Sequence, residues 1–497
     1  MQRISIDPIT RLEGHGKIDI ILNDAGDVEN VYFQVPELRG FEQFCVGRLP
    51  EDMPLITSRI CGVCPEAHHL ASAKALDALF AADPPSAAKK IRELFYMTFY
   101  VTDHTTHFYA LGGPDFIVGP DAPPSERNIL GVARKVGLDI AKEVIGCRAR
   151  NHAIIRKIGG RGVHPTAGVP GGWSRPVTEE ERQEIEDAAK KNIQFALFSL
   201  KAFDDIVLKN PAYLELVTSD IYLHKTYSMG TVDAGNKVNF YDGMIRVVDP
   251  EGKELVTYHP SDYMNQIAER VEPWTYLKYP YLKKIGWKGL VDGMDSGVYT
   301  ATPLSRLNVS DGMATPLAQE HFERLYETFG CKKINGRYQP IHHRLATHWA
   351  RLIELLYAAE HMLDLAKDPE ITAPEVRRIP EPGSSINRVG IGSVEAPRGT
   401  LTHHYTTDEK GALKYVNLIV GTTNNYAPIS MSIKRVAEKL ITGGKVVEEG
   451  ILNRVEMAFR LYDPCFSCAT HALPGKMPMV LKIRDKRGEL LQTIKRD

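Results

Sequence analysis

Residues 59–69 read RICGVCPEAHH and place Cys61 and Cys64 on one short turn in front of a run of helix-forming residues. A second pair, Cys465 and Cys468, lies in the segment DPCFSCATH near the other end of the chain. Four thiolates are a suitable ligand set for a thiophilic metal. Because nearly the whole chain separates the two pairs, a shared site requires both ends of the chain to meet. The cysteines therefore predict a fold built around one buried site.

Three kinds of site fit these cysteines. A structural zinc site with four thiolate ligands is fully compatible with the ligand count. Zinc ribbons, however, usually place the two pairs about 15–20 residues apart in a small module, whereas here a long, helix-rich stretch intervenes. A thioredoxin-like redox pair is less compatible, because no βαβ pattern accompanies the pairs. The cysteines alone leave a metal reaction centre and a structural zinc site open.

The composition excludes several classes of protein. With 61 Lys and Arg against 62 Asp and Glu, the formal charge is −1, so no broad field favours nucleic acid. Hydrophobic residues at 43% and charged residues at 25% argue against a disordered chain, and seven cysteines are too few and odd in number for a disulfide scaffold. No run approaches the roughly 20 apolar residues of a membrane helix, and the N-terminus has no signal-peptide core. We expect a cytoplasmic protein without a membrane span.

Hydrophobic periodicity predicts mainly helices. The expected helices cover residues 65–80, 86–111, 179–208, 316–329 and 341–365. The third of them should begin at a capping box formed by Thr178 and Glu181. Residues 159–176 are too rich in Gly and Pro for either regular structure.

Strand-like alternation predicts β-hairpins at the periphery. The clearest has strands over residues 17–22 and 28–34 around a short turn. Further strands are expected over 217–260, with a turn at 249–252, and a hairpin over 401–420. No repeat or long linker marks a domain boundary. The expected fold class is mainly α with peripheral β-hairpins (α+β), with long central helices around a buried metal site.

The residues around the cysteines belong to a set of five motifs. Together the motifs resemble the signatures of nickel-iron hydrogenase large (catalytic) subunits, in the order found in that family. They are Arg11-Leu12-Glu13-Gly14-His15, Arg39-Gly40-Phe41-Glu42, Arg59-Ile60-Cys61-Gly62-Val63-Cys64 with His68, Ala396-Pro397-Arg398-Gly399, and Asp463-Pro464-Cys465-Phe466-Ser467-Cys468 with His471. The resemblance implies the nickel-iron hydrogenase large-subunit fold and points to the soluble cytosolic branch of the family.

The resemblance also implies unequal roles for the four cysteines. Cys61 and Cys465 would bind nickel terminally, and Cys64 and Cys468 would bridge nickel to an iron that carries CO and cyanide. Polarisable sulfur suits two soft metals at once. Such a centre would cleave dihydrogen reversibly and heterolytically, because a Lewis-acidic metal and a nearby base can separate its charges. The Cys465 thiolate would accept the proton.

Glu13 is the expected next proton carrier, since burial raises the pKa of a carboxyl toward the range of a general base. Without the resemblance, a surface glutamate in front of a strand is the simpler interpretation. Arg398 would lie above the open coordination position, where a guanidinium hydrogen-bonds cyanide and polarises hydrogen. Asp103 and Asp463 would pair with that arginine.

Two further polar residues complete the centre that the resemblance implies. Thr422, in the segment Val420-Gly421-Thr422-Thr423, would hydrogen-bond the other cyanide, although Gly421 replaces the proline common in other branches. His68 would donate a hydrogen bond to a bridging thiolate and tune its basicity. A lone helical histidine is, however, more often simply packed.

A second ion, magnesium or iron, is implied near the C-terminus. Its ligands would be Glu42, His471 and a backbone carbonyl around Leu418. The resemblance further divides the chain into a single large catalytic domain, residues 1–471, and an extension, 472–497, that a maturation endopeptidase removes after nickel insertion. The run MVLKIRDKRGELLQTIK in this extension is compatible with a hairpin.

The path of the electrons implies partner subunits. Because the chain has no spare cysteine cluster for iron-sulfur centres, we expect a small subunit that carries them, with further electron-transfer subunits of the NAD(P)/flavin or heterodisulfide reductase type. The acceptor would be NAD(P), a deazaflavin or a heterodisulfide reductase. The alternative is a non-catalytic scaffold subunit of a complex-I-like redox assembly, stabilised by a four-cysteine zinc site. Such a scaffold would not need Glu13, Arg398 or Asp463.

Overall fold

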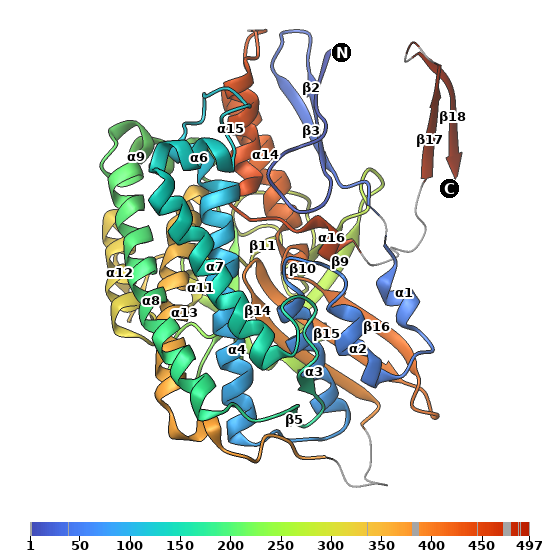
Figure 1. Cartoon of the computed structure of the whole chain (residues 1–497). Helices are drawn as coiled ribbons and strands as arrows, with labels where there is room; N and C mark the ends of the chain where they lie inside the picture. The colour runs from blue at the N-terminus through green and yellow to red at the C-terminus, as the bar shows by residue number, and fades with distance from the viewer. Residues whose placement is uncertain are drawn as a thin grey trace.

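A bundle of long helices forms one side of the molecule. Its helices are α4 (Ser86–Thr106), α7 (Leu138–Gly159), α8 (Glu179–Phe203), α12 (Pro316–Thr328) and α13 (Thr347–Lys367). The computed structural model describes residues 2–37, 39–334, 336–379, 387–444, 446–470, 479–485, 487 and 489–496. Figure 1 shows the bundle helices side by side, with most of the strands on the other side.

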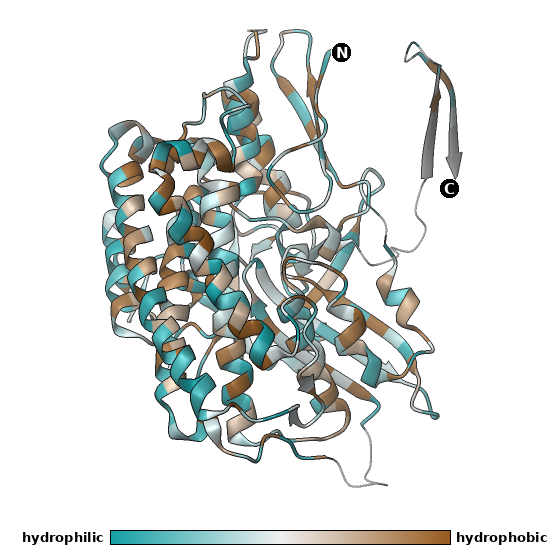
Figure 2. Cartoon of the chain, viewed as in Figure 1, coloured by the Kyte–Doolittle hydropathy of each residue, from teal (hydrophilic) through white to brown (hydrophobic). Residues whose placement is uncertain are grey.

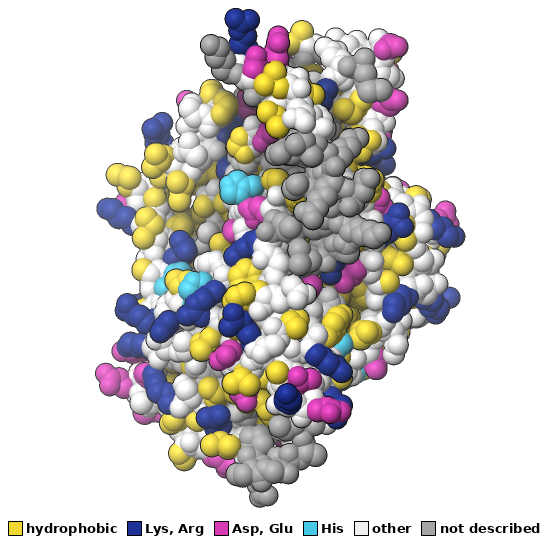
Figure 3. All heavy atoms as spheres, turned by 90° about the vertical axis from the view of Figure 1, so that its right-hand side faces the viewer, with side chains coloured by type: hydrophobic (Ala, Val, Ile, Leu, Met, Phe, Trp, Pro, Cys, Tyr) yellow, Lys and Arg dark blue, Asp and Glu magenta, His cyan; other side chains and the backbone are white. Residues whose placement is uncertain are grey.

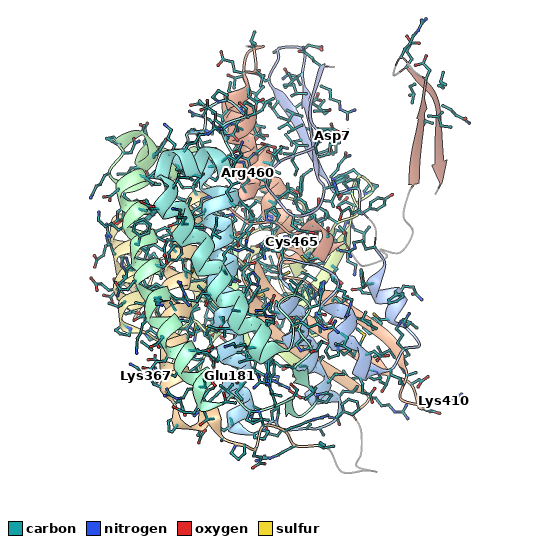
Figure 4. All side chains as sticks on the ribbon, in the orientation of Figure 1. Asp7, Glu181, Lys367, Lys410, Arg460 and Cys465 are labelled. Atoms are coloured by element: carbon teal, nitrogen blue, oxygen red, sulfur yellow. The ribbon has the colours of Figure 1, made fainter. Side chains whose placement is uncertain are left out.

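Helix α13 is the centre of the bundle. Its sequence THWARLIELLYAAEHMLDLAK is buried on nearly all sides, as expected of a helix that is covered all round by others, and it packs against α8, α4 and α12. Figure 4 labels Glu181 near the start of α8 and Lys367 at the end of α13, and both lie at the same end of the bundle. The two helices therefore run antiparallel.

The remaining helices are shorter. They are α1 (Phe41–Cys45), α2 (Met53–Thr57), α3 (Pro65–Leu79), α5 (Pro114–Ile117), α6 (Ile129–Val136), α9 (Pro211–Thr218), α10 (Tyr263–Gln266), α11 (Pro303–Val309), α14 (Tyr426–Leu440), α15 (Glu449–Arg460) and α16 (Phe466–Ala469). Helix α3 packs against the strands β14 (Val389–Ala396) and β15 (Gly399–Thr407), and α14 packs against α15 and β3 (Val28–Gln34). These contacts bring the N-terminal and C-terminal parts of the chain together.

Most of the predicted helices are confirmed. The capping box of Thr178 and Glu181 is formed at the start of α8. The helix predicted over 86–111 is α4 followed by a wider π-helical turn, His107–Gly112. The helix predicted over 341–365 instead begins at Thr347. Residues 344–346 form a separate 3-10 turn, and Ile341 lies outside it, with its N–H and C=O both hydrogen-bonded by the side chain of Asn308.

The predicted hairpins are also confirmed, and strands were missed beside two of them. β2 (Lys17–Leu22) pairs antiparallel with β3 at the predicted positions, and β1 (Gln2–Ile6) adds a third strand. β15 pairs with β16 (Leu413–Ile419), and β14 completes that sheet. In the C-terminal extension, β17 (Met479–Arg484) and β18 (Leu490–Arg496) form the expected hairpin.

The middle of the chain supplies a four-stranded sheet in the order β11-β6-β7-β8. Its strands are β6 (Tyr227–Val232), β7 (Met244–Val248), β8 (Glu254–Tyr258) and β11 (Tyr299–Thr300). The turn expected at residues 249–252 connects β7 and β8. Three two-stranded pairs complete the described strands: β4 (Gly168–Val169) with β5 (Gly172–Trp173), β9 (Ile267–Val271) with β10 (Lys278–Leu282), and β12 (Lys333–Ile334) with β13 (Arg337–Tyr338). The fold is therefore α+β with small sheets, as predicted.

The long helices carry both polar and apolar residues along their length, as Figure 2 shows. This pattern is typical of helices that bury one face and leave the other in water, whereas α13 is buried nearly all round. Within the ranges described above, no helix combines the length and the apolar character that a bilayer span requires.

Candidate metal centre

The two cysteine pairs meet in the interior of the molecule. The Sγ atoms of Cys61 and Cys465 are 3.3 Å apart, and those of Cys64 and Cys468 are 3.2 Å apart. All four sulfurs lie within 4.8 Å of one another, and all four residues are buried. These separations exceed the about 2.05 Å of a disulfide. Figure 4 shows Cys465 near the centre of the molecule, between the bundle and the strands.

Local structure sets the position of each pair. Cys64 is the N-cap of α3 and is followed by Pro65, a residue that favours the first helical position. Cys465 is the N-cap of the short helix α16. Each CxxC pair therefore lies at the N-terminal end of a helix, where the first backbone N–H groups have no partner within the helix. The Val63 N–H donates to the Sγ of Cys61 over 3.1 Å.

The thiols influence one another strongly. Hydrogen bonds from the neighbouring thiols lower the pKa of Cys61, whereas burial raises the pKa of Cys465 and of Cys468 well above the usual range. Four thiolates at such short distances would repel one another. Metal cations would offset that repulsion, so the donor set fits a positively charged centre.

Glu13 reaches the cluster from the N-terminal segment. Its Oε2 lies 3.0 Å from the Sγ of Cys465 and accepts a 3.1 Å hydrogen bond from the Ser467 N–H. The backbone also joins the two segments, because the Phe466 N–H donates to the Glu13 carbonyl over 3.0 Å. Burial raises the pKa of Glu13, and hydrogen bonds from Cys465 and Ser467 oppose that shift. The carboxyl is therefore placed to exchange a proton with Cys465.

A buried arginine faces two carboxylates beside the cluster. Arg398 Nη1 donates to Asp103 Oδ1 over 3.1 Å, and its Nη2 lies 2.9 Å from Asp463 Oδ2. Burial alone would lower the pKa of Arg398, but the two carboxylates raise it well above its usual value. Burial raises the pKa of Asp463 to about 7. The guanidinium therefore stays charged in the interior.

Asp463 has an unusual backbone conformation. Its φ of 54° lies in the left-handed region, which costs a residue other than glycine about 1–3 kcal/mol. The residue precedes Pro464 and Cys465. The turn thus directs a carboxylate toward Arg398 while it presents Cys465 to the other thiols.

Thr422 hydrogen-bonds Cys465, and His68 lies on α3, the helix that begins after Cys64. The Thr422 hydroxyl accepts a 3.0 Å hydrogen bond from the Cys465 N–H, which leaves its own proton available to donate. His68 Nδ1 is 3.1 Å from His403 Nε2, and burial lowers the pKa of His68 to about 4. In the part of the chain that the structure describes, His68 Nε2 is buried and has no hydrogen-bond partner.

The expected ligands of a second ion are only partly described. Glu42 Oε1 accepts a 2.8 Å hydrogen bond from the Leu418 N–H, so these two residues do meet. Lys278 Nζ lies 3.8 Å from the other carboxylate oxygen. Burial raises the pKa of Glu42 to about 7. His471 lies outside the described residues.

The donor set fits a nickel-iron centre. Thiolates are the ligands that soft transition metals prefer, and two close sulfur pairs can be shared between two metals. Within the described ranges, buried donors without a partner include the Nε of Arg398 and the Thr423 hydroxyl. Buried polar groups seldom lack partners, so these atoms are consistent with a bound group that the chain itself does not supply.

Comparison with known proteins identifies the class. The sequence profile of a family described as nickel-dependent hydrogenase matches residues 39–122 and 124–471, and a profile described as HoxL-like matches residues 3–38. The chain therefore belongs to the nickel-dependent hydrogenase family. It is the large subunit of a hydrogenase, an oxidoreductase whose four cysteines fit the nickel-iron centre.

The chain is similar to individual hydrogenase subunits along its whole length. The chain is 47% identical over 495 residues to an iron-sulfur subunit of the F420-non-reducing hydrogenase of Archaeoglobus profundus, with 100% of both chains covered. It is 35% identical to the beta subunit of the NAD-reducing hydrogenase HoxS of Cupriavidus necator, with 99% of both covered. A solved NAD+-reducing [NiFe]-hydrogenase in the H2-reduced state matches with a TM-score of 0.86 and 34% identity, over 95% of this chain and 100% of that one.

The structure adds contacts that the sequence did not predict. His403 on β15 contacts His68, Ser467 contacts Glu13, and Glu37 accepts a 3.0 Å hydrogen bond from the Ser467 hydroxyl. The signal for Ser467 was available, because it lies inside the second CxxC pair. His403 has no such signal, since alternation along a strand shows only which residues are buried.

Proposed function

We propose that the chain cleaves dihydrogen reversibly and heterolytically into protons and electrons. One observation carries this proposal: the Glu13 carboxyl lies 3.0 Å from the Sγ of Cys465, at the edge of a buried four-thiol cluster. A structural zinc site needs the thiols but no adjacent carboxyl. The match to the nickel-dependent hydrogenase family also favours a hydrogenase over a zinc-stabilised scaffold.

When bound, the nickel-iron centre would supply the Lewis acidity that polarises dihydrogen. Cys61, Cys64, Cys465 and Cys468 would hold it, with Cys64 and Cys468 as bridges. Cys465 would take the proton at Sγ and pass it to Glu13 Oε2, which is within hydrogen-bond distance. The raised pKa of Glu13 supports this role, because burial makes this carboxylate a stronger proton acceptor than an exposed one.

Three polar residues would donate hydrogen bonds to the centre, two of them to the cyanide ligands of the iron. Arg398 is supported by its charged, buried guanidinium and its unpartnered Nε, and the Asp103 and Asp463 carboxylates orient it. Thr422 keeps a hydroxyl proton to donate to cyanide. His68 would donate from Nε2 to a bridging thiolate.

A magnesium or iron ion bound by Glu42, His471 and a backbone carbonyl near Leu418 is part of the proposal. The contact between Glu42 and Leu418 supports it. We further propose that residues 1–471 form one catalytic domain, and that an endopeptidase removes 472–497 after nickel insertion. The lone hairpin β17–β18 supports the separation, because a two-stranded hairpin is marginally stable by itself.

The electrons would leave through an iron-sulfur small subunit docked beside Cys61 and Cys64. Five exposed apolar side chains lie in the segment 44–63, which leads up to and into this pair: Phe44, Val46, Leu49, Leu55 and Val63. Figure 3 faces the side of the molecule that carries α1 and α2, and it shows hydrophobic groups among Lys and Arg. A short electron-transfer distance favours this side, since Val63 is exposed between two buried cysteines.

Beyond the small subunit, we propose further subunits of the NAD(P)/flavin or heterodisulfide reductase type. The names of the relatives support this: one hydrogenase is NAD-reducing, and another does not reduce F420, which makes a deazaflavin acceptor the weakest of the three. A cytoplasmic location is supported by the seven cysteines, which are all free thiols, as reducing compartments favour.

Metal analysis tests the proposal. The purified complex should contain nickel and iron, and its infrared spectrum should show bands of bound CO and cyanide. Zinc without nickel and iron, and an infrared spectrum without those bands, would instead support the scaffold.

A further inference from the structure

A row of neighbouring polar residues leads from Glu13 to the surface. We propose that Ser467, Glu37 and His15 form an exit path along which the proton taken up by Glu13 reaches water. This path rests on the proposed function, because it begins where Cys465 gives a proton to Glu13. It extends that function by assigning proton transfer to three residues of this chain.

The first link joins Glu13 to Ser467. The Ser467 N–H donates to Glu13 Oε2 over 3.1 Å, and the nearby Ser467 hydroxyl lowers the pKa of this carboxyl. A hydroxyl can accept one hydrogen bond while it donates another. Ser467 can therefore receive a proton from Glu13 and release its own in the opposite direction.

The second link joins Ser467 to Glu37. The Ser467 hydroxyl donates to Glu37 Oε2 over 3.0 Å. The other carboxyl oxygen, Oε1, contacts His15 Nδ1. One carboxyl oxygen of Glu37 therefore faces Ser467, and the other faces His15. A carboxyl in this position can take a proton at Oε2 while a proton on Oε1 moves to the imidazole.

The last link reaches solvent. The Glu37 side chain is 18% exposed and that of His15 is 74% exposed. Imidazole is the side chain that most readily takes up and releases protons between pH 5 and 8. His15 would accept the proton at Nδ1 and give the Nε2 proton to water. One proton enters the path at Sγ of Cys465 and one leaves at His15, so charge is conserved.

The backbone holds this path in place. Glu13 and His15 flank Gly14, whose φ of +87° is one that side-chain-bearing residues rarely adopt. A Cβ at position 14 would lie 2.9 Å from the Ser467 nitrogen and 3.2 Å from its Oγ. The missing side chain therefore lets Ser467 lie directly between the residues that it connects.

The test compares two reactions of the metal-loaded complex. Conversion of para- to ortho-hydrogen needs only cleavage and recombination, whereas exchange of D2 with water also needs the proton to leave. Glu37→Gln keeps hydrogen-bonding groups but cannot transfer a proton. We expect it to slow D2 exchange at least about tenfold, while para–ortho conversion stays within about twofold. Glu37→Asp should restore part of the exchange.

An infrared measurement gives a readout independent of turnover. In the H2-reduced Glu37→Gln protein, Glu13 should remain protonated, so its carboxylic C=O band should persist after hydrogen is removed. The Glu13→Gln variant, which lacks this carboxyl, assigns the band. The same band behaviour in the wild-type protein and in Glu37→Gln would overturn the path.

A matched pair elsewhere controls for general effects of the substitution. Glu93 contacts His361 over 2.9 Å, with side chains 19% and 22% exposed. Glu93→Gln should leave both reactions unchanged, and an equal loss of exchange in this variant would overturn the path.

If Glu37→Gln does not bind nickel and iron, His15→Gln at the exposed end provides the test. In His15→Gln, exchange of D2 with water should slow down and recover with added imidazole. Unchanged exchange in this variant would overturn the path. Absence of both reactions in the wild-type complex would instead contradict the proposed function.

Discussion

The Glu13 carboxyl lies 3.0 Å from the Sγ of Cys465, although 452 residues separate them in the chain. The two segments are joined a second time through the backbone, since the Glu13 carbonyl accepts a hydrogen bond from the Phe466 N–H. An acid next to a thiol in a buried site is a suitable pair for proton transfer. This relationship connects the N-terminal motif to the metal centre and leads to the first prediction.

Glu13→Gln should separate metal binding from proton transfer. The amide keeps nearly the same shape and still accepts from the Ser467 N–H, so nickel and iron contents should stay within experimental error of wild type. Exchange of D2 with water should fall by about 10²-fold or more, because glutamine cannot carry the proton. Mass spectrometry of the evolved HD and H2 measures this. Wild-type exchange in the variant would exclude Glu13 from the mechanism.

The sequence predicted the elements whose signal is local. The hairpin of residues 17–22 and 28–34 and the capping box at Thr178 depend on neighbours along the chain, and both are confirmed. The start of the helix predicted at 341 was wrong, because a distant side chain, that of Asn308, takes up both backbone hydrogen bonds of Ile341. A periodic pattern contains no information about such a partner.

In the candidate site, too, local motifs could be predicted from the sequence and contacts between distant segments could not. The motifs identified the cysteines, Glu13 and Arg398, and the structure brings them together. The contact of His68 with His403 could not be predicted, because the register of β15 depends on pairing with β14 and β16. The distances between Arg398 and its two carboxylates likewise depend on three segments far apart in sequence.

Arg398→Met should destabilise the protein as well as inactivate it. Two buried carboxylates, those of Asp103 and Asp463, would lose the cation that they face. Removal of one partner from a buried ion pair costs about 3–5 kcal/mol. Thermal unfolding should therefore shift to lower temperature. Arg398→Lys keeps one charge but loses the two-sided geometry, so it should be more stable than Arg398→Met.

Arg92 gives the control for this prediction. It forms a buried ion pair with Asp77 away from the cysteines. Arg92→Lys should lower the unfolding temperature but leave the cyanide infrared bands unchanged. A shift of those bands in Arg398→Lys is expected, since the arginine would hydrogen-bond cyanide. Unshifted bands would contradict that role.

The exposed apolar residues near Cys61 are expected to contact the iron-sulfur small subunit, so a charged residue introduced there should weaken its binding. Leu49 and Leu55 are 58% and 40% exposed. Leu49→Asp combined with Leu55→Asp should weaken binding of the iron-sulfur small subunit by about tenfold or more, because assembly would bury two unpaired carboxylates. Co-purification and sedimentation measure the loss. Val446→Asp, at a position 85% exposed, should leave the complex intact, and equal losses in both variants would argue against this docking surface.

Gly14→Ala tests how closely the two ends of the chain approach. A Cβ there would lie 2.9 Å from both Phe466 Cβ and the Ser467 nitrogen, and the backbone φ is +87°. Overpacking and a left-handed conformation each cost about 1–3 kcal/mol. The N-terminal segment should move away from the second cysteine pair. We expect a lower unfolding temperature and a severalfold loss of bound nickel.

Gly47→Ala separates the clash from the backbone strain. Gly47 has a similar φ of +84°, but a Cβ at that position has no atom within 4 Å. It should lower stability by only about 1 kcal/mol and leave the nickel content unchanged. Nickel loss in Gly14→Ala but not in Gly47→Ala therefore measures the contact between Gly14 and Ser467. Equal nickel contents in the two variants would show that metal binding does not depend on this close approach.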